Sequence, residues 1–196
     1  AFAQDATAGE KKADMCIGCH GIPGYQASFP LIHKVPMISG QGAKYIVGAL
    51  TAYKKGERKH PTMKAIAASL SEQDMADPGA LYSTQAGPAT AESAPAPTPP
   101  ATVAELLKKG NCASCHGENL NKPIDPSYPK LAGQHADYLY VALKAYQTEG
   151  NAQVGRGNAL MGGMAKPFSH AELKQIASYI ATLPSDLKTV PESRFR

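Results

Sequence analysis

The sequence contains no run of about 18 or more apolar residues, which is the length that a helix needs to cross a bilayer. Charge of one sign is also scarce, because the formal net charge is only +4 and no basic stretch carries interleaved aromatic residues. Sustained alternation of apolar and polar residues is missing as well. We therefore expect no transmembrane segment, no nucleic-acid binding and an all-α fold.

Cysteine is sparse: the chain has four, in two close pairs, and a histidine follows each pair. These residues are Cys16, Cys19 and His20 in the first motif and Cys112, Cys115 and His116 in the second. On a helix, residues three and four apart share a face. Two thiols so placed can bond both vinyl groups of one haem, and the imidazole then reaches the iron from the same side. The sequence therefore predicts two covalently bound haem c groups, each with a histidine ligand.

Other readings of Cys-x-x-Cys fit less well. Zinc-binding pairs usually lie roughly 12–20 residues apart, and these pairs are much further apart. A thioredoxin-like redox pair needs a βαβ context that the pattern does not show. Structural disulfides are possible in an oxidising compartment, but they leave the repeated histidine unexplained.

The chain reads as two copies of one unit around a linker. Residues 83–101 are rich in Pro, Ala, Ser and Thr, and this composition predicts an extended linker. It divides the chain into a first domain, 1–82, and a second domain, 102–196, with a C-terminal tail. Domains this small usually need a staple such as a covalent cofactor.

Both copies carry the same helix signals, and we expect three to four helices in each. Capping boxes are predicted at Thr7–Glu10 and Thr102–Glu105, and again at the last helix, which starts at Ser71 or Ser169. Between them lies a Pro-x-x-x-Gly-Gln loop, at 36–41 and 129–134, and then a helix with two tyrosines. That helix is expected to stop at a glycine, Gly56 in the first copy and Gly150 in the second.

Methionine is the expected sixth ligand of each iron, because its soft thioether favours the ferrous state. Met63 and Met161 each precede the serine of the last helix by eight residues, since 71 − 63 and 169 − 161 are equal. This register favours Met161 over Met164, which remains an alternative. The other candidates of the first half are Met15, Met37 and Met75.

The ligating histidines need a partner for their second ring nitrogen. Pro36 and Pro129 occupy matching loops, and their carbonyls could accept that N–H bond, although the prolines could also serve only to stiffen a turn. A bis-histidine haem is the sharper alternative. The remaining histidines do not fall at corresponding points of both halves, so we expect them to be exposed or hydrogen-bonded; they are His33, His60, His135 and His170.

Taken together, the repeated motifs resemble the di-haem cytochrome c4 family of bacterial class I cytochromes c, over about residues 7–82 and 102–184. The resemblance implies two class I cytochrome c domains in tandem, in approximate two-fold relation. It also implies the axial pairs His20/Met63 and His116/Met161. It further implies a periplasmic protein, soluble or loosely membrane-associated, that delivers electrons to a terminal oxidase or a similar acceptor. Ala1–Ala3 is compatible with the end of a signal peptide, or with a chance alanine-rich start.

The first half departs from the family pattern in its last helix. Pro78 should kink that helix or end it near Ala76, because proline removes a helical hydrogen bond. Leu81 stands where Tyr179 stands in the second half, so a tyrosine bond to a haem propionate would be lost there.

The expected function is one-electron relay between redox protein partners, without small-molecule catalysis. The alternative is the cytochrome subunit of a larger dehydrogenase, such as a flavocytochrome c. A peroxidase with one open haem would need one methionine to be displaced. For docking, we hypothesise that an acidic partner binds over the first haem through Lys54, Lys55, Arg58 and Lys59.

Overall fold

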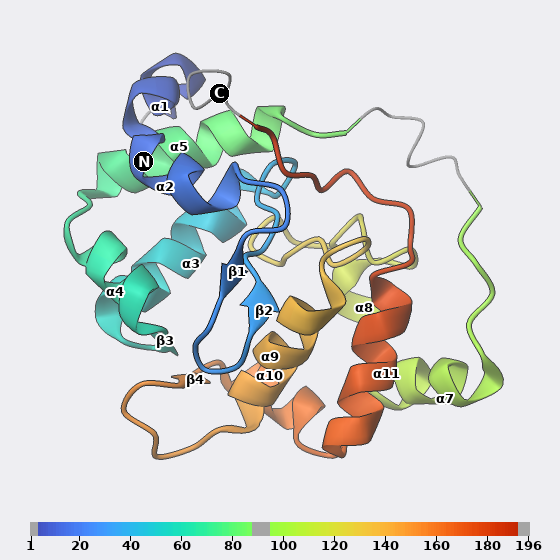
Figure 1. Cartoon of the computed structure of the whole chain (residues 1–196). Coiled ribbons are helices and arrows are strands. Elements are labelled where there is room, and N and C mark those ends of the chain that lie inside the picture. Colours follow the sequence, from blue (N-terminus) through green and yellow to red (C-terminus); the bar gives the residue numbers. More distant parts are fainter. Residues whose placement is uncertain (1–3, 88–94, 192–196) are drawn as a thin grey trace.

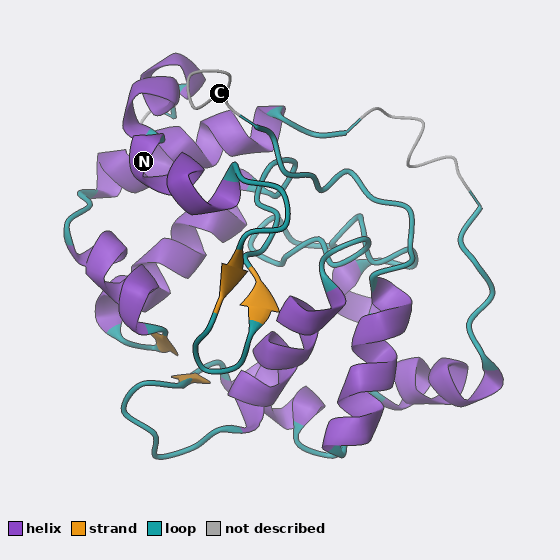
Figure 2. Cartoon of the chain, viewed as in Figure 1, coloured by secondary structure: helices purple, strands orange, loops and turns teal. Residues whose placement is uncertain are grey.

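The computed structural model describes residues 4–87 and 95–191, which form two helical halves side by side (Figures 1 and 2). The first half contains α1 (Ala6–Lys12), α2 (Asp14–His20), α3 (Ala43–Lys55), α4 (Pro61–Ala68) and α5 (Glu72–Thr84). The second half contains α7 (Ala101–Lys109), α8 (Ala113–His116), α9 (Ala136–Gln147), α10 (Ala159–Ala165) and α11 (His170–Ile180). The all-α prediction is confirmed, but each half has five described helices rather than three to four.

The same order of helices recurs in both halves, as the repeat predicted. The last helices, α5 and α11, both begin after a serine whose side chain accepts the N3 backbone N–H. Asp74 and Glu172 return the bond to the backbone of Ser71 and Ser169, which completes both predicted capping boxes. These paired caps fix the start of the helix that follows each candidate methionine.

The predicted caps of the first helices are wrong. Asp5 caps α1, and its carboxylate accepts from the Thr7 and Ala8 N–H groups. Thr7 therefore lies inside the helix rather than at its cap. Pro100 occupies the cap position of α7 and offers no side-chain bond, so Thr102 already lies inside that helix. The stop at Gly56 is confirmed, with φ at 79°. Gly150 does not end α9, which stops at Gln147.

Pro78 does not end its helix. α5 continues to Thr84, and it is buried against α1 on one side and α3 on the other. A proline inside a helix costs ~3 kcal/mol or more, so packing on both sides must outweigh that loss. α1 comes so close that a Cβ added at Gly9 would lie 2.4 Å from the Asp77 carbonyl oxygen.

Short strands and the C-terminal segment join the halves. β1 (Gln26–Ala27) pairs with β2 (His33–Lys34) inside the first half, whereas β3 (Arg58–Lys59) pairs with β4 (Gly155–Arg156) of the second. The chain after α11 runs back over the first half (Figure 1), where the Lys188 N–H donates to the Ser39 carbonyl at 3.1 Å. The two halves therefore share backbone hydrogen bonds at two separate places.

No helix within the described ranges, 4–87 and 95–191, has the length and apolar character needed to cross a membrane.

The crossing of α1 and α5 gives a first prediction. Gly9→Ala should destabilise the protein by about 1–3 kcal/mol, because the new methyl group has no room beside the Asp77 carbonyl. Gly48→Ala is the matched control, since Gly48 is also helical and has nothing within 4 Å of an added Cβ. Urea unfolding of the haem-loaded protein measures both, and an unchanged midpoint for Gly9→Ala would contradict the close packing.

Candidate functional site

The two Cys-x-x-Cys-His motifs lie on short helices at equivalent places. Cys16, Cys19 and His20 all belong to α2. In the second half, α8 carries Cys115 and His116, and Cys112 precedes it with helical dihedral angles of φ −60° and ψ −40°. The helical arrangement expected of two thiols and one imidazole is therefore present in both halves.

The four thiols do not form disulfides. Burial raises the pKa of Cys16, against a hydrogen bond from Tyr82 that lowers it, and burial also raises the pKa of Cys112. Redox-active Cys-x-x-Cys pairs have a lowered thiol pKa instead. Within the described part of the chain, no three His, Cys, Asp or Glu side chains gather as a metal site would require. The lowered thiol pKa of a redox-active pair is therefore not found at Cys16 or Cys112.

Both histidines donate to the predicted carbonyls. His20 Nδ1 lies 2.8 Å from the Pro36 oxygen, and His116 Nδ1 lies 2.9 Å from the Pro129 oxygen. A carbonyl only accepts, so Nδ1 carries the proton and Nε2 keeps a lone pair for a metal. Burial lowers the pKa of both rings, against the raising effect of these bonds, which favours the neutral form that ligates iron. The predicted role of the two prolines is confirmed.

The candidate methionines occupy identical positions in their helices. Met63 and Met161 are each the third residue of a short helix, α4 and α10. The Met63 N–H donates to His60 Nδ1 at 3.4 Å, and the Met161 N–H donates to Asn158 Oδ1 at 2.9 Å. The structure therefore supports the serine register. Met164 is 39% exposed.

The other methionines and histidines have ordinary structural surroundings. Met75 is buried on α5, where the Thr51 hydroxyl contacts its sulfur, and Met15 is exposed. His33 Nδ1 donates to the Leu31 carbonyl, and His60 caps α4. His135 precedes α9 and His170 begins α11. The expectation of hydrogen-bonded histidines is confirmed for His33 and His60.

A cluster of arginines and tyrosines lies where the halves meet. Arg58 donates to the hydroxyls of Tyr45 and Tyr138 at 3.1 and 2.8 Å, and Arg156 donates to Tyr138 at 3.1 Å. Neither guanidinium pairs with a carboxylate among the described residues, and Arg58 Nε has no hydrogen-bond partner there. Burial alone would raise the pKa of Tyr138, but the two guanidiniums lower it to about 8.

Two uncompensated buried cations are costly unless an anion joins them. Haem carries propionate carboxylates, which guanidinium groups bind well. The cluster therefore fits a haem-binding protein, and Arg58 and Arg156 are the residues that would hold the propionates. Sequence reasoning missed Arg156, although the signal was available, because each arginine precedes its candidate methionine by five residues.

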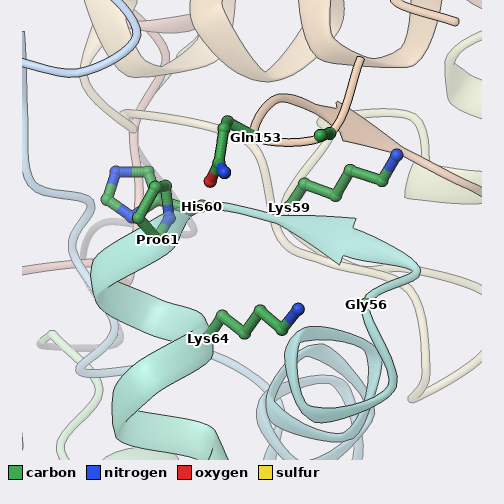
Figure 3. A pocket seen from close by; sticks show the side chains of 7 residues that line it. Gly56, Lys59, His60, Pro61, Lys64 and Gln153 are labelled. Atoms are coloured by element: carbon green, nitrogen blue, oxygen red, sulfur yellow. The ribbon is translucent and has the colours of Figure 1, made fainter. Parts of the chain in front are cut away.

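The position of Arg58 also corrects the docking hypothesis. Its side chain lies in the cluster between the halves, and Lys59 Nζ donates to the Asn151 carbonyl of the second half at 2.6 Å. Figure 3 shows Lys59, His60, Lys64 and Gln153 around a small pocket of about 100 Å³ at this junction. Two of the four basic residues thus join the halves rather than face a partner.

Tyr179 differs from the expectation as well. Its hydroxyl donates to the Pro97 carbonyl at 3.0 Å, so it holds the segment before α7. In the first half, Leu81 is buried, and the neighbouring Tyr82 is buried close to Cys16. The two last helices therefore differ in how these side chains pack, because Leu81 is buried whereas the Tyr179 hydroxyl bonds to the Pro97 carbonyl.

Comparisons with known proteins agree with this site. The cytochrome c family model matches residues 100–184. Cytochrome c4 of Azotobacter vinelandii is 30% identical over 204 residues, covering 92% of this chain and 90% of that protein. A thiosulfate dehydrogenase electron acceptor of Stutzerimonas stutzeri is 29% identical, covering 86% of this chain and 78% of the relative. The crystal structure of reduced recombinant cytochrome c4 from Pseudomonas stutzeri superposes with a TM-score of 0.67, at 29% identity, covering 92% and 100% of the chains.

The sequence, the fold and the relatives agree on one cofactor and one activity. The chain binds two covalently attached haem c groups, one for each Cys-x-x-Cys-His motif, and transfers electrons with redox protein partners. With its two matched halves and a relative of 30% identity across nearly its full length, the chain belongs to the cytochrome c4 family.

Proposed function

We propose that His20 and Met63 are the axial ligands of the first haem, and that His116 and Met161 are those of the second. Cys16 and Cys19 would attach the first haem, and Cys112 and Cys115 the second. The observation that carries this proposal is the pair of matched histidine bonds, from Nδ1 to Pro36 and to Pro129. The matched places of the two methionines at the third residue of a capped helix support it.

The haem iron supplies a one-electron couple, and the protein sets its potential. The proline carbonyls orient the imidazoles and raise their basicity, which favours ferric iron. The thioethers favour ferrous iron and raise the potential. Arg58 and Arg156 would compensate the propionate charge where the halves meet.

We further propose that the protein is a periplasmic carrier that delivers electrons to a terminal oxidase or a similar acceptor, without catalysing bond chemistry itself. The cytochrome c4 relatives support an electron carrier. Ala1–Ala3, which suggested a signal-peptide end, lies outside the described residues.

One comparison also suggests a candidate electron donor for this protein. The thiosulfate dehydrogenase electron acceptor among the relatives favours the reading in which a dehydrogenase reduces this protein. Rapid mixing of the oxidised protein with such a dehydrogenase and its substrate separates the roles. Fast reduction of both haems would place the dehydrogenase before this carrier, whereas slow reduction together with fast oxidation by a terminal oxidase would leave the donor as another protein.

Ligation can be tested at the two neighbouring methionines of α10. Met161→Ala should abolish the methionine-to-iron charge-transfer band of one haem, because it removes the sixth ligand. Met164→Ala is the matched control on the same helix and should leave both bands intact, since Met161 and not Met164 occupies the helix position that Met63 has in the first half. Optical spectra of the oxidised holoproteins measure this. The reverse result, a loss with Met164→Ala alone, would disprove the serine register.

The two haems should titrate separately. The last helix of the first half carries Pro78 and Leu81, where the second half has Ile176 and Tyr179. We therefore expect the two haems to differ in hydrogen bonding and exposure, which tune the potential. A spectroelectrochemical titration should show two resolvable one-electron steps, with the more exposed haem in the first half. One wave that fits two identical sites would contradict this expectation.

A further inference from the structure

Two buried glutamines cross between the halves in a reciprocal way. Gln134 Oε1 accepts from the Met37 N–H at 3.0 Å, and its Nε2 donates to the Met37 carbonyl at 2.9 Å. Gln41 makes the same pair of bonds to Lys130, at 2.8 and 3.1 Å. Both side chains are 4% exposed. Each half therefore holds one residue of the other half by both backbone groups.

The glutamines are themselves fixed in their own half. Oε1 of Gln41 also accepts from the Gly42 N–H, and Oε1 of Gln134 from the His135 N–H, each at 3.1 Å. The preceding glycines donate to the last helix of the same half, Gly40 to the Tyr82 carbonyl and Gly133 to the Ile180 carbonyl. Each glutamine amide is therefore held in a fixed orientation by its own half.

The two residues that the glutamine amides bind, Met37 and Lys130, directly follow the prolines whose carbonyls accept from the histidines. The Met37 nitrogen and the Pro36 carbonyl belong to one planar peptide group, so fixing the N–H also fixes the direction of the carbonyl. That carbonyl accepts from His20 Nδ1 at 2.8 Å. The Lys130 nitrogen and the Pro129 carbonyl form the equivalent peptide, which accepts from His116 Nδ1 at 2.9 Å.

Hydrogen bonds in series strengthen one another. When the Met37 N–H donates to Gln134, the Pro36 oxygen becomes a better acceptor for His20. A stronger Nδ1–H bond makes the imidazole a more basic ligand, which stabilises ferric iron and lowers the reduction potential.

We propose that each glutamine is a positioning residue for the axial histidine of the opposite half: Gln134 acts on His20, and Gln41 acts on His116. The potential of each haem then depends on the other half being docked in place. This proposal rests on the proposed ligation by the two histidines.

The test measures the potentials of both haems in the holoprotein variants Gln134→Ala, Gln41→Ala and a control. Two further variants, Met63→Ala and Met161→Ala, show which redox wave belongs to which haem. Gln134→Ala should raise the potential of the first haem, and Gln41→Ala that of the second. Outer partners of a ligand typically change affinity by 10–100-fold, and this contact is one bond further out, so we expect about a threefold to tenfold change in the redox equilibrium. Tenfold corresponds to about 59 mV for one electron.

Asp137→Ala is the matched control for loosening of the interface. Asp137 Oδ2 accepts from the Lys34 N–H of the first half at 2.9 Å. The peptide group of that N–H does not include the Pro36 or Pro129 carbonyl that accepts from a candidate ligand histidine. Asp137→Ala should leave both potentials unchanged. The hyperfine-shifted Nδ1–H signal of His20 should move in Gln134→Ala, while that of His116 stays in place.

Three results would overturn the proposal: no shift in either glutamine variant, a shift confined to the haem of the substituted half, or the same shift in Asp137→Ala. The proposed ligation fails separately. If Met161→Ala and Met63→Ala each leave the spectra of both haems unchanged, the ligand assignment is wrong, whereas intact ligation without the crossed shifts rejects only the role of the glutamines.

Discussion

The hydrogen bond from each histidine Nδ1 to a proline carbonyl is the contact on which the rest of the structure depends. It fixes the imidazole tautomer and leaves Nε2 for iron, at 2.8 Å in the first half and 2.9 Å in the second. The same two loops carry the glutamines that join the halves. One short repeated loop therefore serves both to orient the histidine and to join the halves.

The junction between the halves has a second, electrostatic part. Arg58 and Arg156 lie there with several tyrosine hydroxyls and without a carboxylate partner among the described residues. Buried charge of one sign destabilises a protein unless a counter-charge arrives. Haem propionates would supply that charge, so we expect haem attachment and docking of the halves to stabilise each other.

The repeat made most of this site predictable from the sequence. The cysteine spacing and the proline carbonyls followed from the repeated motifs, and aligning Ser71 with Ser169 set the methionine register. Local rules failed where tertiary packing decides: Pro78 remains inside α5 because α1 and α3 pack on it, and Asp5 takes the cap that Thr7 was expected to provide. The inward turn of Arg58 was not predictable, because it depends on a strand pairing between halves that no local pattern specifies.

The proposed binding of both haems is tested most directly by a crystal structure of the haem-loaded protein with the irons located by anomalous scattering. It predicts two irons, one between His20 Nε2 and the Met63 sulfur, the other between His116 Nε2 and the Met161 sulfur. It also predicts that propionates reach Arg58 and Arg156 while both histidine–proline bonds persist. An iron with an open sixth position, or one ligated by a second histidine, would contradict it.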